Sequence, residues 1–231
     1  VNCKLNAVRH TKIVATLGPA SSSDAMLDEL IAAGVDIFRL NFSHGSVQDH
    51  LDRGALVRDV ARRAGKAVAI MADLQGPKIR VGKFEGGKVR LEEGAKFILD
   101  GATSELGSAE RVGLDYKDLP RDVRAGDTLL LDDGLIRLAV DAVRGSEVYT
   151  TVVVGGELSN NKGINKAGGG LTAPALTAKD MDDIKTAMGM QAEYVAVSFP
   201  KNATDMEMAR QLANVAGEPW RHRPALIAKI E

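Results

Sequence analysis

The chain has 231 residues, of which 45% are hydrophobic and 26% charged, as in ordinary globular proteins. Its 30 basic and 31 acidic residues give a net charge of -1, and aromatic residues make up only 4%. Nothing in this balance favours nucleic acid or an anionic membrane as a partner. A single cysteine, Cys3, excludes an intramolecular disulfide framework. Without a spanning apolar run or a signal peptide, the sequence predicts a soluble, cytoplasmic protein.

Strand and helix patterns alternate through the first part of the chain. Apolar or alternating runs predict strands at 12–17, 36–45 and 67–72. Helical periodicity predicts two intervening helices, one between the serines at 21–23 and Gly34 and one over 46–64. The inward face of the second helix is predicted from its apolar side chains: Leu51, Ala55, Leu56 and Val60. This order indicates parallel strands joined by right-handed crossovers.

The helical period disappears after about residue 76. Short alternating runs replace it at 88–91, 97–99, 128–131, 135–140 and 148–154. Asp132-Asp133-Gly134 lies between two of these runs and is a hairpin signal. We therefore expect an inserted all-β domain that ends near the glycine triplet at 168–170.

The first pattern resumes beyond the glycine triplet. Thr177 is the expected cap of a helix with Met181, Ile184, Ala187 and Met188 on its inner face. The remaining predicted elements are a strand at 194–199, a helix at 204–216 and a fifth strand at 225–231.

The predicted strand at 36–45 has two chemically distinct faces. Phe38, Leu40 and Phe42 alternate with polar residues, and the polar set is Arg39, Asn41 and Ser43. A solvated surface strand would show the same alternation. However, a parallel sheet is normally covered on both faces, so buried polar groups there need partners. We interpret this strand as one that presents an anion- or metal-binding cluster at its carboxyl end.

Charged residues also mark the carboxyl ends of two other predicted strands. Lys229 and Glu231 leave the same face of the fifth strand, a pattern suited to metal-assisted phosphoryl or enolate chemistry, or to a solvated terminal ion pair. Asp73 directly follows the third strand, where a turn aspartate is the commoner role. Gly76-Pro77 then breaks the backbone before two cations, Lys78 and Arg80. Two further polar residues, His44 and Lys162, are ordinary loop residues when each is taken alone.

Five segments together resemble the pyruvate kinase family, in the same order and spacing. They are TKIVATLGPAS at 11–21, RLNFSHG at 39–45, DLQGPKIR at 73–80, SNNKGIN at 159–165 and AKIE at 228–231. The glycine triplet before the returning helix resembles the bacterial type.

The resemblance implies a parallel (β/α)8 TIM-type barrel, incomplete here with about five strands, that carries an inserted small β-barrel lid domain. The expected domains are the first part of the barrel at 1–75, the lid at 76–172 and the second part of the barrel at 173–231. The implied activity is transfer of the phosphoryl group of phosphoenolpyruvate to ADP, giving pyruvate and ATP in glycolysis. A segment that should hold a second magnesium carboxylate is missing, so this portion alone is expected to be inactive.

The resemblance also assigns roles to residues of this chain. Arg39 and Lys229 would both bind the substrate and both be catalytic. Arg39 would bind the substrate phosphate, and Lys229 would stabilise the phosphoryl group in transfer. A monovalent-cation site would be formed by Asn41, Ser43, Asp73 and the carbonyl of Leu74. The residues expected near the nucleotide are Asn41, His44, Arg80 and Lys162. Glu231 would be one carboxylate ligand of Mg²⁺ or Mn²⁺.

Two positions depart from the pattern of potassium-activated members. Lys78 stands where those members carry glutamate, and Leu74 replaces a hydroxyl residue. The ammonium of Lys78 would supply the charge that K⁺ otherwise provides, so we expect little K⁺ dependence. The implied partners are the substrates and further copies of the same chain, since the full-length protein is expected to be a homotetramer.

Two other interpretations are compatible with parts of the pattern. One is a non-catalytic fragment or regulatory homologue that keeps phosphate binding but lacks a complete metal site. The other is a different barrel enzyme acting on pyruvate or phosphoenolpyruvate, such as an aldolase. The long β insertion argues against the aldolase, because such aldolases lack it.

Overall fold

The computed structural model describes residues 10–77 and 79–230. The described residues form two compact units, one made of residues 10–77 with 175–230 and the other of residues 79–174. Cys3, Lys78 and Glu231 lie outside the described residues, and so do the roles predicted for Lys78 and Glu231.

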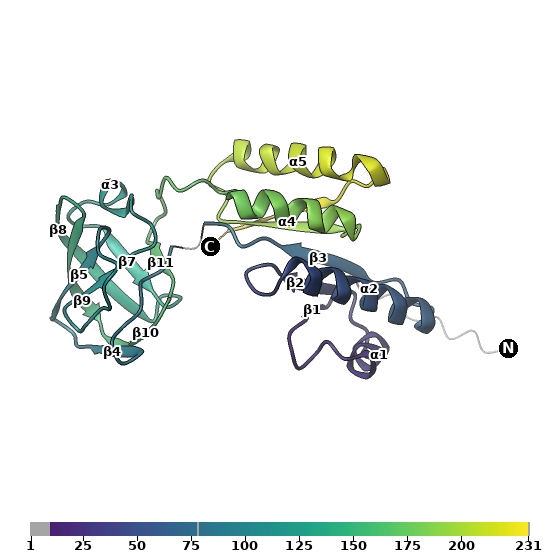
Figure 1. Ribbon diagram of the computed structural model, residues 1–231, viewed down its shortest axis with the longest axis horizontal. Helices are drawn as coiled ribbons and strands as arrows, with labels where there is room; N and C mark the ends of the chain where they lie inside the picture. Colours follow the sequence, from purple (N-terminus) through teal and green to yellow (C-terminus); the bar gives the residue numbers. More distant parts are fainter. Residues whose placement is uncertain (1–9, 78, 231) are drawn as a thin grey trace. The chain divides into compact units, whose positions relative to one another are not determined.

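A five-stranded parallel sheet forms the centre of the first unit (Figure 1). Its order is β1-β2-β3-β12-β13, so strands that follow one another within this unit are neighbours in the sheet. The strands are β1 (Val14–Thr16), β2 (Ile37–Asn41), β3 (Ala69–Asp73), β12 (Tyr194–Ser198) and β13 (Ala225–Lys229). The predicted α/β class with a parallel sheet is therefore confirmed.

Four helices connect and cover these strands. They are α1 (Asp24–Ala33), α2 (Val47–Ala64), α4 (Ala178–Gly189) and α5 (Ala203–Gly217), and a short 3₁₀ helix, η1 (Glu218–Trp220), follows α5. Successive helices pack on one another, α1 on α2, α2 on α4 and α4 on α5. Side-chain oxygens of Ser23, Ser46, Thr177 and Asn202 cap their amino ends. The apolar core lies between helices and sheet, where Phe38 and Leu40 of β2 are buried.

Two predicted helix faces were partly wrong. On α2, Ala55 is exposed and Leu51 and Leu56 are only partly buried. The buried residues of that helix are His50, Gly54, Val57, Val60 and Ala61. On α4, Met181 is 37% exposed. Asp180 and Asp183 are buried in its place, because each has hydrogen-bond partners on the sheet side of the helix or at its cap.

The second unit is built mainly from short antiparallel strands. One sheet has the order β11-β7-β8-β9-β5-β6 and the other pairs β10 with β4. The strands are β4 (Lys88–Leu91), β5 (Lys96–Asp100), β6 (Arg111–Gly113), β7 (Thr128–Leu131), β8 (Ile136–Arg144), β9 (Glu147–Val154), β10 (Gly156–Ser159) and β11 (Ile164–Lys166). The predicted hairpin is confirmed, since β7 and β8 are antiparallel and flank Asp132 and Asp133, both with positive φ.

A short helix corrects the all-β expectation for this unit. It is α3 (Leu119–Asp122), which begins with Pro120 in its first turn. Proline favours the start of a helix because it lacks the N–H that would be unpaired there.

Within residues 10–77 and 79–230, no helix has the length and apolarity needed to cross a membrane.

Candidate active site

Polar side chains gather at the carboxyl edge of the parallel sheet in the first unit. The strand register pairs Asn41 at the end of β2 with Asp73 at the end of β3, and Ser198 at the end of β12 with Lys229 at the end of β13. Because parallel strands end at the same edge, these four residues lie at one edge of the sheet although they are far apart in sequence. Asp73 and Lys229, which the sequence placed at the carboxyl ends of two strands, therefore lie at this edge, and Arg39 of β2 contacts Asp73 there.

Asp73 and Arg39 form a two-pronged ion pair. Nε of Arg39 donates to Oδ2 of Asp73 at 2.7 Å, and Nη2 contacts the same oxygen. Nη1 of Arg39 donates to Oγ1 of Thr16 at 3.0 Å. The Asp73 side chain is only 3% exposed, so its charge needs these donors. The guanidinium is thereby held in one orientation at the edge of the sheet.

A second cation shares the same carboxylate. Nζ of Lys229 lies 3.3 Å from Oδ1 of Asp73 and donates to Oγ of Ser198 at 2.9 Å. Two cations and one carboxylate leave a net charge of +1 on the cluster. An edge that is net positive, partly screened from water and carries guanidinium and ammonium donors suits a phosphate or carboxylate ligand.

The family comparison agrees with this geometry. Residues 8–231 match the model of the family described as pyruvate kinase, barrel domain. The chain belongs to the pyruvate kinase family. It is 52% identical to pyruvate kinase of Haemophilus influenzae and 53% identical to pyruvate kinase II of Salmonella typhimurium, over 97% of this chain in each case. Pyruvate kinase of Mycobacterium tuberculosis is 43% identical over 96% of the chain. Each alignment covers 46% of the relative, so the chain spans about half the length of the curated relatives it matches.

The pyruvate kinase segment at 39–45 leaves β2 through a turn. Oδ1 of Asn41 accepts a hydrogen bond from the backbone N–H of Ser43 at 3.0 Å. The backbone N–H of Phe42 donates to the carbonyl of Asp73 at 3.0 Å, which ties this turn to β3. His44 is exposed just beyond it. Three residues predicted for the cation site, Asn41, Ser43 and Asp73, therefore lie on joined segments.

Two residues that were not predicted from the sequence contact Phe42 in this turn. Nζ of Lys179, in the first turn of α4, donates to the carbonyl of Phe42 at 2.8 Å and also to Asp183. The ring of His50 on α2 stacks on Phe42, with 4.0 Å between ring centroids. Burial lowers the pKa of His50, which favours the neutral imidazole. Neither residue had a sequence signal beyond ordinary helix positions.

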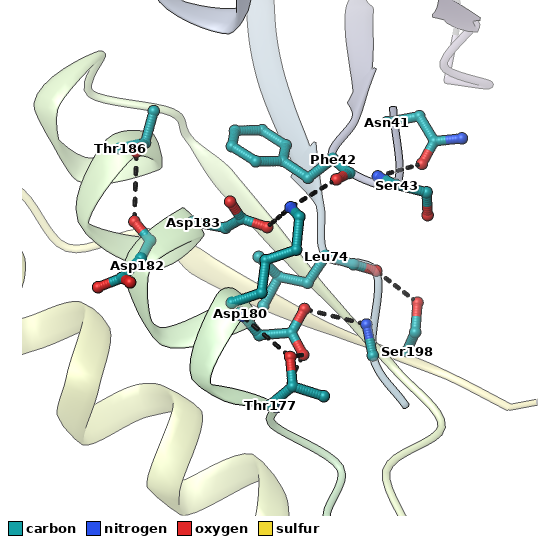
Figure 2. Close-up of polar contacts among 12 residues, drawn as sticks. Asn41, Phe42, Ser43, Leu74, Thr177, Asp180, Asp182, Asp183, Thr186 and Ser198 are labelled. Carbon is teal, nitrogen blue, oxygen red and sulfur yellow. Dashed lines mark hydrogen bonds and ion pairs between the residues drawn. The ribbon is translucent and has the colours of Figure 1, made fainter. Parts of the chain in front are cut away.

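Ser198 is a third residue that the sequence analysis missed, although it lies in a predicted strand. It is 2% exposed and its hydroxyl donates to the carbonyl of Leu74 at 2.8 Å (Figure 2). Leu74 was predicted as a carbonyl ligand of a monovalent cation. Its carbonyl oxygen is thus hydrogen-bonded to a side chain that also contacts Lys229.

The segment that leaves β3 is fixed at Gly76. Its N–H donates to Oδ1 of Asp180 at 3.0 Å. Oδ2 of Asp180 forms the capping box of α4 with Thr177, and Figure 2 shows these two side chains in contact. Gly76 has φ +65, and a Cβ there would lie 2.9 Å from Cβ of Ser198. Only glycine fits this crossing without a shift of the backbone.

Arg80 and Lys162, the other predicted nucleotide residues, lie near each other in the second unit. Arg80 forms an isolated antiparallel β-bridge with Gly163, and its Nη1 donates to the carbonyl of Asn161 at 3.3 Å. Nζ of Lys162 donates to Oδ1 of Asp132 at 2.7 Å. That hydrogen bond raises the pKa of Lys162, so its ammonium stays charged.

The sequence predicts two metal ions, a divalent ion held by Glu231 and a monovalent ion held by oxygen atoms near Asp73. The described residues contain no group of three or more His, Cys, Asp or Glu placed to hold a metal ion. Oδ1 of Asp73 is buried and accepts no hydrogen bond from the described residues, but the ammonium of Lys229 lies 3.3 Å from it. An ammonium therefore already balances this oxygen, and the atoms predicted to bind a monovalent ion are all oxygens, the donors that hard cations prefer.

Proposed function

We propose that this chain forms the phosphate- and cation-binding half of a pyruvate kinase. That enzyme transfers the phosphoryl group of phosphoenolpyruvate to ADP and forms pyruvate and ATP in glycolysis. The observation that carries the proposal is the shared carboxylate of Asp73, which holds Arg39 and Lys229 together in a cluster of net charge +1. The family match supports this choice among phosphate-binding functions.

The proposed chemistry assigns separate tasks to the two cations. Arg39 binds the phosphate of phosphoenolpyruvate through guanidinium N–H groups that Asp73 does not occupy. The bond from phosphorus to the enol oxygen breaks, and a bond from phosphorus to a β-phosphate oxygen of ADP forms. Lys229 meets the negative charge during transfer, and the enolate then takes a proton at its methylene carbon. The chain contributes positioning and charge stabilisation, as in other phosphoryl transfers.

Two kinds of cation belong to this proposal. Glu231 is proposed as one carboxylate ligand of Mg²⁺ or Mn²⁺, and this ion, when bound, would neutralise phosphate charge. Asn41, Ser43, Asp73 and the Leu74 carbonyl are proposed as oxygen ligands of a monovalent cation. The support for the second assignment is that Asn41, Ser43 and Asp73 lie on segments joined by hydrogen bonds.

The remaining assignments concern the wider protein. Arg80 and Lys162, with Asn41 and His44, are proposed to contact the nucleotide. We propose the second unit as a lid that excludes water, and the parallel sheet as part of an eight-stranded TIM-type barrel. The full-length protein is proposed to be a cytoplasmic homotetramer.

A coupled assay tests the proposal. The protein for this assay is a polypeptide of the relatives' full length that contains residues 1–231, and we call it the full-length protein. With phosphoenolpyruvate, ADP, Mg²⁺ and lactate dehydrogenase, the wild type should oxidise NADH. Lys229→Met should lower kcat about 10²- to 10³-fold, because a charge that stabilises the transition state is lost. Lys185→Met, at a 70% exposed lysine side chain, is the matched control and should leave kcat unchanged. Equal rates for Lys229→Met and wild type would refute the proposed role.

Potassium dependence is a separate prediction. We expect similar initial rates in tetramethylammonium buffer with and without KCl, because Lys78 would supply the charge of K⁺. Lys78→Glu should create a requirement for K⁺, because the positive charge that would replace K⁺ is lost. A large activation of the wild type by KCl would contradict the assignment of Lys78.

A further inference from the structure

Ser198 ends β12, which lies between β3 and β13; Leu74 directly follows β3, and Lys229 ends β13. Its hydroxyl oxygen is 2.8 Å from the carbonyl oxygen of Leu74 and 2.9 Å from Nζ of Lys229. The side chain is 2% exposed, whereas the side chain of Lys229 is 32% exposed. A buried hydroxyl therefore contacts the proposed catalytic lysine from the protein side.

The direction of both hydrogen bonds follows from the number of protons. A carbonyl oxygen can only accept and an ammonium can only donate, whereas a hydroxyl has one proton and two lone pairs. Ser198 must give its proton to Leu74 and accept one from Lys229. Both contacts are satisfied only in this arrangement, so the hydroxyl cannot rotate without losing one of them.

The backbone around Ser198 is fixed by independent contacts. The N–H of Leu74 donates to the carbonyl of Ala196 at 3.0 Å, which holds the acceptor beside β12. Ser198 pairs in register with Lys229 on β13. Gly76 crosses so near that an added Cβ would lie 2.9 Å from the Ser198 carbonyl oxygen. The acceptor, the hydroxyl and the lysine backbone are thus held by one part of the sheet.

Lysine needs such an anchor more than arginine does. Its four-carbon stem is flexible and its ammonium is a point charge without a preferred plane. Asp73 attracts the ammonium of Lys229 at 3.3 Å, but Oδ2 of that carboxylate is already engaged by Arg39. The contact with Ser198 supplies a second fixed point and so defines where the ammonium lies.

We propose that Ser198 is a positioning residue that orients Lys229 for phosphoryl transfer. This inference rests on the proposed function, in which Lys229 meets charge that develops in the transition state. A displaced ammonium would lower the rate of transfer more than the affinity for phosphoenolpyruvate, because the ground-state phosphate contacts are made by Arg39.

Kinetics of Ser198→Ala in the full-length protein test the inference. We expect kcat to fall about 10- to 100-fold, since a hydrogen bond to a charged group is lost, while KM for phosphoenolpyruvate changes less than about twofold. Ser198→Cys keeps a weak S–H donor and a similar volume, and should recover part of kcat. An unchanged kcat in Ser198→Ala would overturn the inference.

Thr150→Val is the matched control for loss of a buried hydroxyl. Thr150 is 1% exposed and its hydroxyl donates to the carbonyl of Phe97 at 2.7 Å, but it lies in the second unit. We expect this variant to keep the wild-type kcat. An equal fall of kcat in Thr150→Val and Ser198→Ala would mean that general destabilisation explains both, and would also overturn the inference.

A chemical readout separates this inference from the proposed function. Acetic anhydride labelling, measured by mass spectrometry relative to Lys185, should modify Lys229 several-fold faster in Ser198→Ala than in wild type or Thr150→Val. The reason is that the amino group loses its buried acceptor. If the wild type labels as expected but has no kinase activity, the proposed function fails and the Ser198 contact stands. Unchanged labelling of Lys229 would refute the contact itself.

Discussion

At the scale of single residues, the site depends on one carboxylate that serves two cations. Asp73 is almost fully buried, and both Arg39 and Lys229 direct their charge toward it. Without this carboxylate the two cations would repel each other at the sheet edge. Asp73 is therefore as important for the stability of the unliganded site as for any cation that binds there.

Replacing Asp73 by asparagine tests this balance. Asp73→Asn should lower the free energy of unfolding by about 1.5–3 kcal/mol, as for hydrogen bonds to charged groups. Urea unfolding provides the measurement. Asp59→Asn is the control, because the Asp59 side chain is 46% exposed and pairs with Arg62 and Arg63 at the surface. This variant should change the free energy of unfolding by less than about 0.5 kcal/mol. Equal effects of the two variants would show that the shared carboxylate has no special energetic role.

The sequence revealed the charged members of the site more readily than the neutral ones. Arg39, Asp73 and Lys229 each follow or interrupt an apolar strand, so their position at a parallel edge was predictable. Ser198 ends a strand with a residue that is common at strand ends, and its partners lie 124 and 31 residues away. Such a contact depends on strand order and register, which local pattern does not contain.

At the scale of secondary-structure elements, α4 shows why apolar periodicity can misplace a helix face. Periodicity assumes that only apolar residues face the core. Asp180 faces inward because it accepts a hydrogen bond from the Gly76 N–H, and Asp183 because it accepts one from the Lys179 ammonium, one turn earlier on the same helix. Met181 is displaced to the surface as a consequence. On α2, inward-facing His50 and Gly54 have the same effect.

The buried carboxyl of Asp183 predicts a pH dependence of stability. Burial raises its pKa above the ordinary value of 3.8. Well below pH 3.8 this carboxyl is protonated in both the folded and the unfolded chain, and its contribution to the free energy of unfolding is fully present. As pH rises through the raised pKa of the folded state, the unfolded chain has already ionised, so this contribution is lost.

Asp183→Asn should therefore flatten the decline of stability across that window. Urea unfolding at a series of pH values from about 3 upward measures the difference between variant and wild type. Asp182→Asn, which removes a 72% exposed carboxylate from the same helix, is the control. A wild-type slope that Asp183→Asn does not alter would contradict the assignment.

The crossing at Gly76 joins β3 to the start of α4 and to Ser198. Gly76→Ala should destabilise the protein by about 1–3 kcal/mol, because a positive φ and a close backbone contact act together. Gly65→Ala is a matched control, since Gly65 has φ +62 but nothing within 4 Å of an added Cβ. The difference in urea-unfolding free energy between the two variants isolates the contact with Ser198. Equal losses would show that backbone strain alone determines the effect.

At the scale of the whole chain, the parallel sheet and the change to short β-strands were predictable from hydrophobic periodicity. Alternating strands and helices require parallel neighbours, and the described sheet has its five strands in that order. The short strands β6, β10 and β11 and the helix α3 were not predicted. Each of these strands contains a single large apolar residue, whereas the predicted strands β4 and β7, which are as short, contain two or three. Family membership is shown by the match over residues 8–231.

The central claim is that the Arg39–Asp73–Lys229 cluster serves phosphoryl transfer from phosphoenolpyruvate to ADP. Phosphorus NMR of the full-length protein with these two substrates and Mg²⁺ tests it most directly, because each phosphorus atom has its own signal. We predict that the phosphoenolpyruvate signal declines while the γ-phosphate signal of ATP grows by an equal amount, and that Lys229→Met slows both changes about 10²- to 10³-fold. Loss of phosphoenolpyruvate to inorganic phosphate with ADP unchanged, or no change in wild type, would contradict the account.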